Sequence, residues 1–289
     1  MNSGHTPKIW SKGIGEREIE MSDLVSIIMP CYNTAKFIPA SIRSVQAQTY
    51  ENWELIIVDD RSTDNSVEAV KSFDDPRIRL LQNERNSGAA LSRNYALREA
   101  RGKWIAFLDS DDLWMPEKLE KQVGFMESHG CHFSYTNYAE IDEDGNRKGI
   151  TVTGPKVITR TGFFNYCWPG CLTVMYDQFA VGRIQIADIK KNNDYAIWLK
   201  VCRKADCRLL DEELALYRRG RSESVSNASI MNLIRWHYKL YRNAESQNVL
   251  AAICNTLRNM IFGLYKKLRY VKKGSNGISS LLDENSGRC

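Results

Sequence analysis

Short, largely apolar runs alternate with stretches of helical spacing through the first 110 residues, and this alternation restricts the possible fold more than any other feature. Runs of this length and composition are typical of strands that are buried on both faces of a sheet. Strands alternating with helices in this way favour a parallel, right-handed, doubly wound α/β sheet. The predicted strands span residues 24–29 (ended by Pro30), 53–58, 77–81 and 104–108, and the predicted helices span residues 36–48, 62–73 and 88–100.

The pattern changes after about residue 130, where aromatic alternation and isolated apolar runs replace the regular repeat. A hairpin turn is predicted at residues 142–146, and helical periodicity dominates from Ile230 onward. Further strands are predicted at residues 132–139, 172–176 and 213–217, and further helices at residues 162–166 and 194–203.

Charge and composition exclude several classes of protein. The 289 residues are 43% hydrophobic, which supports a substantial core, and the net charge is 40 − 35 = +5. The basic residues of 255–273, a segment without any acid, account for that excess, so a nucleic-acid surface is not predicted. No run is long enough to span a bilayer and no signal peptide is recognisable, so we expect a cytoplasmic protein with reduced thiols and no zinc site.

An acidic tetrapeptide, Asp109-Ser110-Asp111-Asp112, follows the predicted strand 104–108 directly. In open α/β sheets the carboxyl ends of the strands are where ligands bind. Clustered carboxylates repel one another unless a cation neutralises them, and oxygen ligands suit Mg²⁺ or Mn²⁺. The alternative is an acidic turn that caps the helix beginning near Pro116.

The other strand ends of the first half are also polar, and a parallel sheet brings them to one edge. Tyr32 can stack on a base, Asp60 can accept a hydrogen bond from a base imide, and Arg93 can pair with phosphate. Each element alone is a weak signal, but their order and their placement at strand ends favour one shared ligand.

Four motifs of the first half resemble those of the family 2 inverting glycosyltransferases: Val25–Asn33, Ile57–Asp64, Asn86–Asn94 and Phe107–Asp112. The resemblance implies the A-type glycosyltransferase fold, which is Rossmann-like with a mostly parallel central sheet, a UDP-sugar donor, and Mn²⁺ or Mg²⁺ held by Asp111 with Asp109. The residues predicted to bind the nucleotide sugar are Pro30, Tyr32, Asn33, Asp59, Asp60, Gly88, Arg93, Asp109 and Ser110.

The second half is similar to bacterial glycosyltransferases of teichuronic acid, O-antigen and capsule biosynthesis, through the following motifs: Phe133–Thr136, Cys171–Asp177, Asn193–Leu199, Leu216–Arg218 and Ser222–Ser226. The resemblance implies transfer to a lipid-linked saccharide, with Asp194 as the general base that deprotonates the acceptor. The alternative for Asp194 is an acid that stabilises a helix N-terminus. Many relatives have Glu-Asp where this chain has Asn193-Asp194, so the function of that glutamate is missing here.

Trp168, Trp198 and Arg218 are candidates for contacts with the acceptor. The two tryptophans can form a platform for a sugar or belong to the core. Arg218, with Arg219 and Arg221, can reach the phosphates of either substrate or form a solvated basic turn.

Apolar residues recur at helical spacing between Leu257 and Val271, with basic residues between them. This pattern predicts an amphipathic helix on the inner face of the cell membrane, or a helix packed on the catalytic domain. The expected organisation is a flexible leader (1–22), a catalytic domain (23–225, with a nucleotide-sugar half to 115 and an acceptor half from 116), a helical region (226–273) that associates with the membrane, and a disordered tail (274–289).

Two other functions compete with sugar transfer. A nucleotidyltransferase also uses paired carboxylates at a strand end, but it needs a Gly-rich basic loop after the first strand, where this chain has Pro30 to Asn33. A protein that binds a nucleotide sugar without catalysis would be expected to lack Asp111 or Asp194, and both are present.

Overall fold

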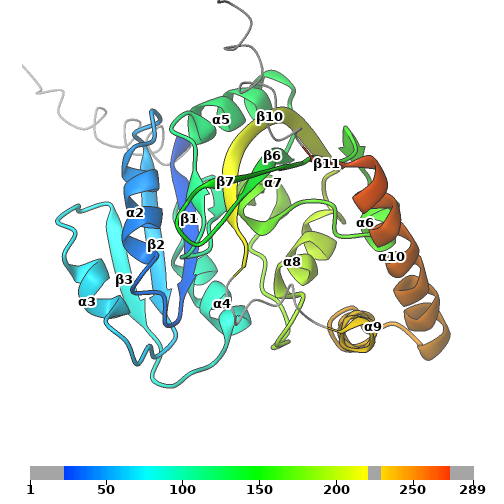
Figure 1. The fold of residues 1–289 in the computed structure, drawn as a ribbon. Helices are drawn as coiled ribbons and strands as arrows, with labels where there is room; N and C mark the ends of the chain where they lie inside the picture. Colours follow the sequence, from blue (N-terminus) through cyan, green and yellow to red (C-terminus); the bar gives the residue numbers. More distant parts are fainter. Residues whose placement is uncertain (1–22, 221–228, 274–289) are drawn as a thin grey trace, which may run out of the picture.

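The computed structural model describes residues 23–220 and 229–273 (Figure 1). The predicted leader, the predicted tail, Arg221 and the Ser222–Ser226 motif lie outside the described residues. The predicted division into domains therefore stays a prediction.

The first half of the chain forms the parallel part of the central sheet. Strands β1 (Val25–Cys31), β2 (Trp53–Asp59), β3 (Ile78–Gln82) and β4 (Trp104–Phe107) pair in parallel in the order β3-β2-β1-β4. The chain moves outward from β1 to β3 and then returns to the other side of β1. This reversal puts a topological switch point between β1 and β4, which is where open α/β sheets bind ligands.

Helices cover both faces of this sheet, and the strands are apolar on both faces for that reason. Helices α2 (Ile38–Gln46), α3 (Ser66–Lys71) and α5 (Lys118–Ser128) pack on one face, where Ile27 and Met29 of β1 point. Helix α4 (Ala89–Glu99) packs on the other face against Ile28. The predicted alternation of strands and helices is confirmed.

The second half adds antiparallel strands to the same sheet. Beyond β4 the order continues through β9, β6 and β7 to β11, while β10 pairs in parallel with β6. The predicted hairpin turn joins β6 to β7. The elements are β5 (Leu113–Trp114), β6 (Phe133–Ile141), β7 (Arg147–Val152), β8 (Val157–Ile158), α6 (Arg160–Asn165), η1 (Cys171–Thr173), β9 (Met175–Asp177), α7 (Gln178–Val181), α8 (Asn193–Val201) and β10 (Cys207–Arg218).

Most of the predicted strands differ from the structure by a few residues at their ends, and three of the differences have a physical reason. Strand β1 continues through Pro30, because β4 pairs with β1 only as far as Ile28 and no neighbour requires an N–H from the proline on that side. The predicted strand at 172–176 begins as the 3₁₀ turn η1. Strand β10 is longer than the predicted 213–217, because bulges near Glu213 accommodate an acidic run that does not alternate.

The C-terminal region is helical, as predicted. Helix α9 (Ile230–Lys239), a π-helical turn (Leu240–Ala244) and α10 (Val249–Arg269) are followed by β11 (Val271–Lys273), which pairs with β7. The chain therefore returns from these helices to the edge of the catalytic sheet (Figure 1).

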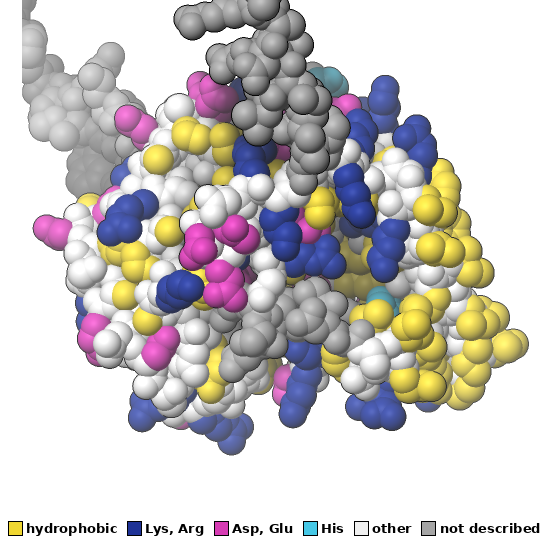
Figure 2. All heavy atoms as spheres, viewed as in Figure 1, with side chains coloured by type: hydrophobic (Ala, Val, Ile, Leu, Met, Phe, Trp, Pro, Cys, Tyr) yellow, Lys and Arg dark blue, Asp and Glu magenta, His cyan; other side chains and the backbone are white. Residues whose placement is uncertain are grey.

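Only part of α10 packs on the domain. The residues that α10 buries are Ala252, Thr256 and Asn259, and Phe262 packs against Trp168. Most of its larger apolar side chains are exposed, together with several of α9, and they gather on one side of the molecule (Figure 2). They are Ile230, Met231, Ile234, Val249, Leu250, Ile253, Leu257, Ile261, Leu264, Tyr265 and Leu268. No helix within the described ranges is both long enough and apolar enough to cross a bilayer.

Candidate active site

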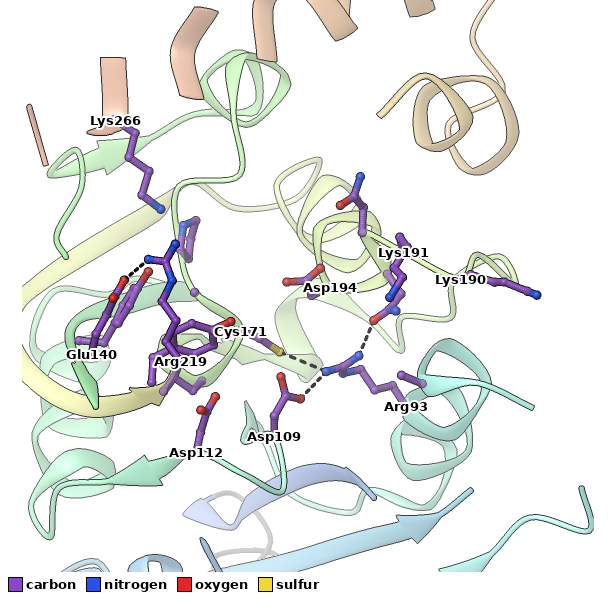
Figure 3. A pocket seen from close by; sticks show the side chains of 18 residues that line it. Arg93, Asp109, Asp112, Glu140, Cys171, Lys190, Lys191, Asp194, Arg219 and Lys266 are labelled. Carbon is purple, nitrogen blue, oxygen red and sulfur yellow. Dashed lines mark hydrogen bonds and ion pairs between the residues drawn. The ribbon is translucent and has the colours of Figure 1, made fainter. Parts of the chain in front are cut away.

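Two adjoining pockets open at the carboxyl edge of the sheet. The smaller, of about 230 Å³, lies at the ends of β1 and β2. The larger, of about 540 Å³, is bounded by α4, β6, α8, α10 and the end of β10 (Figure 3). Ala89, Arg93 and Asp109 line both pockets, so this group marks the boundary between them.

The smaller pocket contains several of the residues predicted to bind the nucleotide sugar. Pro30, Tyr32, Asp60, Ser110 and Asp111 line it. The Tyr32 side chain is 47% exposed, so one face of its ring is available for stacking. The structure thus brings together residues that are up to 81 positions apart in the sequence, because four parallel strands end at the same edge.

Asp60 supports the loop between β3 and α4. Its Oδ1 accepts hydrogen bonds from the Asn83 side chain (2.7 Å) and the Ser87 backbone N–H (2.8 Å), and its Oδ2 accepts one from the Gly88 N–H (2.7 Å). Gly88 has a φ of +86°, a conformation that favours glycine. Reading of the base by Asp60 stays a prediction, but the carboxylate already stabilises this loop.

Three of the predicted donor-binding residues lie outside the pocket linings. Asp59 accepts a hydrogen bond from the Ser62 N–H (3.2 Å), and the Asn33 side chain accepts one from the Thr63 N–H (2.8 Å). Gly88 contributes its N–H to Asp60. These residues shape the loops around the smaller pocket, and their contact with a donor stays a prediction.

Arg93 links the two halves of the site. It is buried, and its guanidinium donates hydrogen bonds to the Asn193 side chain and to the Asp109 carboxylate. Asn193 thus presents a neutral amide to Arg93, where a glutamate would present a second negative charge.

The acidic loop after β4 is held by Arg218. The Arg218 backbone N–H donates to Asp112 Oδ1 (2.8 Å), and its side chain donates to the carbonyl oxygens of Asp111 (2.8 Å), Asp142 (2.8 Å) and Glu143 (2.6 Å). Arg218 is buried and lines neither pocket, which corrects the expectation that it contacts the acceptor. Its charge is used to stabilise loop carbonyls.

Asp112 is an unusual member of that loop. Its carboxyl is buried, and within the described part of the chain its Oδ2 has no hydrogen-bond partner. Burial, and then the neighbouring Asp111 and Asp109, raise the pKa of Asp112 well above its usual range. A carboxyl in this environment is stabilised either by a proton or by a cation.

Asp194 lies in the first turn of α8 and faces the larger pocket, above Asp109 and beside Arg93 (Figure 3). Burial raises the pKa of Asp194, Arg93 opposes that shift, and Asp109 adds to it. Its Oδ1 accepts a hydrogen bond from the Tyr195 N–H (2.8 Å), and its carboxylate points into the pocket.

The residue next to Asp194 connects α8 to the C-terminal region. The hydroxyl of Tyr195 donates to the Phe163 carbonyl, lies 3.0 Å from the Tyr241 hydroxyl, and accepts a hydrogen bond from the Asn259 amide (3.2 Å). All three of the side chains in this network are buried. The helix that positions Asp194 is therefore held by residues from the π-helical turn and from α10.

Both candidate tryptophans belong to the core. Trp198 is fully buried, with its ring 4.9 Å from that of Phe107 in an edge-on contact. Trp168 is 4% exposed, donates from its indole N–H to the Gly162 carbonyl (2.9 Å), and packs against Phe262. These contacts correct the expectation of a sugar platform. The loop Pro169–Gly170 lines the pocket in place of the tryptophans.

Sequence alone gives no individual role to several residues that line the pocket: Glu140, Lys190, Lys191 and Lys266. Arg219, which also lines it, is one of the basic residues predicted either to reach a substrate phosphate or to form a solvated turn. Lys266 is one charge of the predicted C-terminal helix. Glu140 and the two adjacent lysines carry no motif by which sequence alone could find them.

Comparison with known proteins agrees with this geometry. Residues 26–186 match the family described as Glycosyl transferase family 2. A Bacillus subtilis protein named for teichuronic acid biosynthesis, TuaG, is 40% identical over 232 residues, which cover 79% of this chain and 91% of TuaG. Escherichia coli WfgD, named as a UDP-Glc:α-D-GlcNAc-diphosphoundecaprenol β-1,3-glucosyltransferase, is 40% identical over 253 residues, which cover 87% of this chain and 98% of WfgD.

Solved structures show the same fold. Residues 1–349 of S. aureus TarS in complex with UDP-GlcNAc superimpose with a TM-score of 0.63 at 21% identity, over 82% of this chain and 73% of the TarS chain. The Pyrobaculum calidifontis mannosyltransferase PcManGT, in complex with GDP-Man and Mn²⁺, superimposes with a TM-score of 0.56 at 15% identity, over 83% of this chain and 75% of that chain. The family match, the two relatives and the shared fold lead to one conclusion: the chain belongs to glycosyl transferase family 2 and is a glycosyltransferase with the A-type fold.

Proposed function

We propose that the protein moves one sugar, with inversion, from a UDP-sugar to a lipid-linked saccharide in the biosynthesis of a bacterial surface polysaccharide. The observation that carries the proposal is the position of Asp194, whose carboxylate faces the acidic loop across one pocket. The names of TuaG and WfgD support the substrate class, and the TarS complex supports a uridine nucleotide.

In this mechanism Asp194 is the general base. The acceptor hydroxyl attacks the anomeric carbon from the side opposite the diphosphate and gives its proton to Asp194. The bond to the diphosphate breaks with its electron pair leaving on the phosphate oxygen, and the sugar ends inverted on the acceptor. A pKa raised by burial makes the Asp194 carboxylate a stronger base, which favours proton transfer from a hydroxyl.

The acidic loop fits a divalent cation that is shared with the substrate. Within residues 23–220 and 229–273, no three His, Cys, Asp or Glu side chains are arranged to hold a metal by themselves. Mg²⁺ and similar ions are commonly bound through one or two carboxylates together with substrate phosphates. The unpartnered Asp112 Oδ2 supports this proposal, because a buried carboxyl of this kind is stabilised by a cation or by a proton.

Asp111 and Asp109 would hold Mn²⁺ or Mg²⁺, which supplies positive charge against the leaving diphosphate. Arg93 keeps Asp109 in place through their ion pair, and Arg218 keeps the loop backbone in place. The chain itself thus positions the carboxylates before any ligand arrives.

The test is a panel of nucleotide sugars, offered to the purified protein with Mn²⁺ and a synthetic saccharide linked through diphosphate to a short alkyl chain. We expect UDP to be released with one UDP-sugar, in an amount equal to the glycoside formed, and we expect proton NMR to show an inverted anomeric linkage. A retained linkage would contradict the role of Asp194, and absence of transfer from every donor would contradict the proposed function.

We also propose that the exposed apolar side of α9 and α10 lies on the inner face of the cell membrane. Eight apolar side chains of α10 are exposed, and Lys267 and Arg269 stand among them. Burial of this surface in lipid, with roughly 1 kcal/mol for each basic residue near anionic headgroups, would bring the enzyme to a lipid-linked acceptor.

Vesicle flotation tests the membrane proposal. The wild type should float with anionic liposomes at low salt and less at high salt. Leu264→Ser with Leu268→Ser should stay at the bottom, while Lys71→Ser, on the distant helix α3, should float like the wild type. Full flotation of the double variant would show that α10 does not bind the vesicles.

A further inference from the structure

Lys266 is a cation that points from α10 into the larger pocket (Figure 3). Its ammonium donates to the Trp168 carbonyl (2.6 Å) and lies 5.4 Å from the centre of the Tyr166 ring. Among the described residues no carboxylate forms an ion pair with it, and burial lowers the pKa of Lys266 to about 8. A charged group that loses water without gaining a counter-charge is costly, so an anion at this position would be stabilising.

Arg219 provides a second cation in the same part of the pocket. It follows β10, and its guanidinium donates to Glu140 Oε1 at 2.5 Å while its side chain remains 46% exposed. Figure 3 shows Arg219, Glu140 and Lys266 on one side of Asp194, with Lys190 and Lys191 on the other. Glu140 balances the charge of Arg219, whereas Lys266 has no such carboxylate partner among the described residues.

The helix that carries Lys266 also carries the exposed apolar surface. Leu264 and Leu268 lie two residues before and two residues after Lys266, so they are on the opposite side of the helix, and they are 62% and 78% exposed. Tyr265 lies between these two sides; it is 46% exposed and packs against Trp168. Lys266 therefore points into a polar pocket from a helix whose other side is apolar, with Tyr265 between them. A ligand with a saccharide, a phosphate and a hydrocarbon chain in series matches that arrangement.

We propose that Lys266 and Arg219 bind the phosphate group that joins the acceptor saccharide to its lipid. The saccharide then extends toward Asp194, and the hydrocarbon chain leaves past Tyr265 toward Leu264 and Leu268. The assignment rests on the proposed function, because it presumes an acceptor that reaches Asp194. Charge-assisted hydrogen bonds from an ammonium and a guanidinium are the interactions that suit a phosphate diester or diphosphate.

Steady-state kinetics with two acceptors separate this site from other sources of phosphate. One acceptor is a saccharide linked through diphosphate to a short alkyl chain, and the other is the same saccharide as an uncharged alkyl glycoside. For Lys266→Met we expect the KM of the diphosphate acceptor to rise on the order of 10-fold. The KM of the uncharged acceptor and the KM of the donor should stay as in the wild type.

Lys71 provides the control. It has the same charge, but it is exposed, lies on α3 and does not line the pocket. Lys71→Met should leave all three KM values unchanged, and Lys266→Arg should recover most of the affinity for the diphosphate acceptor. Arg219→Gln should also raise the KM of the diphosphate acceptor, and it replaces Lys266→Met in the experiment if that variant does not fold.

The outcomes are distinct. An equal rise of KM for both acceptors would mean that Lys266 only supports the Trp168 loop, and a rise in the donor KM would mean that it binds the donor diphosphate; either result overturns the proposal. A wild-type enzyme that uses both acceptors equally well also overturns it, while the proposed function stands. A wild type that transfers sugar to neither acceptor contradicts the proposed function, and the phosphate site falls with it.

Discussion

The two sides of the active site are built differently. On the proposed donor side, the polar groups at the strand ends are already bonded to other residues: Asp60 accepts three hydrogen bonds, and Asp109 pairs with Arg93. On the proposed acceptor side, side chains come from α8, α10 and the end of β10, and Lys266 has no anionic partner in the described structure. The polar side chains of the proposed donor side therefore help to hold the fold together. Those of the proposed acceptor side contribute less to the fold.

This difference explains which residues can be predicted from the sequence. In the first half, strand, turn and polar group are contiguous in the chain, so the strand order alone predicts that Tyr32, Asp60 and Asp109 meet. Glu140 and Lys266 are 126 residues apart and share the pocket only because α10 returns to the sheet edge. No local pattern encodes that return, and β11, only three residues long, gives no recognisable signal.

In the second half of the chain, residue type alone is a poor guide to which side chains line the site. Trp168, Trp198 and Arg218 are residue types that often bind sugars or phosphates, yet here they are core and loop supports. Their burial depends on packing between elements that are distant in sequence. Asp194 was predictable because it belongs to a motif, and its placement in the pocket agrees with that prediction.

The largest expected effect is on the acceptor side. Asp194→Asn keeps the shape of the side chain and removes the proton acceptor, so kcat should fall by roughly 10²-fold or more. The Kd of the donor, measured by titration calorimetry, should stay near the wild-type value. If turnover is unchanged and donor binding is lost, Asp194 binds the donor. That result would contradict its assignment to the acceptor side.

The next effect belongs to the acidic loop. Asp111→Ala should lower activity on the order of 10- to 100-fold and raise the Mn²⁺ concentration that gives half-maximal rate. EDTA should abolish wild-type transfer, and added Mn²⁺ or Mg²⁺ should restore it. Full activity of Asp111→Ala in chelator would show that this loop holds no catalytic cation.

Stability separates the two sides most directly. Asp60→Ala leaves the Asn83 amide and the Ser87 and Gly88 N–H groups without their acceptor, so the free energy of unfolding should fall by about 2–3 kcal/mol in urea titrations. Lys266→Met, on the proposed acceptor side, removes one hydrogen bond to the Trp168 carbonyl but also a charge without a counter-charge, so the urea midpoint should fall less than in Asp60→Ala. If both variants lose equal stability, the two sides are not built differently.

The smallest effect concerns the pH dependence of the base. Asn193→Glu would place a carboxylate against Arg93, and Arg93 now lowers the pKa of Asp194. With Arg93 neutralised, the pKa of Asp194 should rise further, and the acidic limb of the kcat profile should move to higher pH. Because the base works only when deprotonated, the loss at pH 7 should be less than about tenfold. Asn193→Gln, which adds no charge, is the control, and a shift to lower pH would contradict this account.

The hydrogen bonds of the Tyr195 hydroxyl make the catalytic domain depend on the C-terminal helices. Asn259 of α10 completes the hydrogen bonding of Tyr195, the residue beside Asp194, and the strand that follows α10 completes the edge of the catalytic sheet. A chain cut before α10 would leave two buried tyrosine hydroxyls without this donor and would uncover β7. The C-terminal helices therefore cannot be exchanged freely for those of another protein. A chimera that carries a different membrane-binding helix would need an equivalent of Asn259 to hold Tyr195, and with it Asp194, in place.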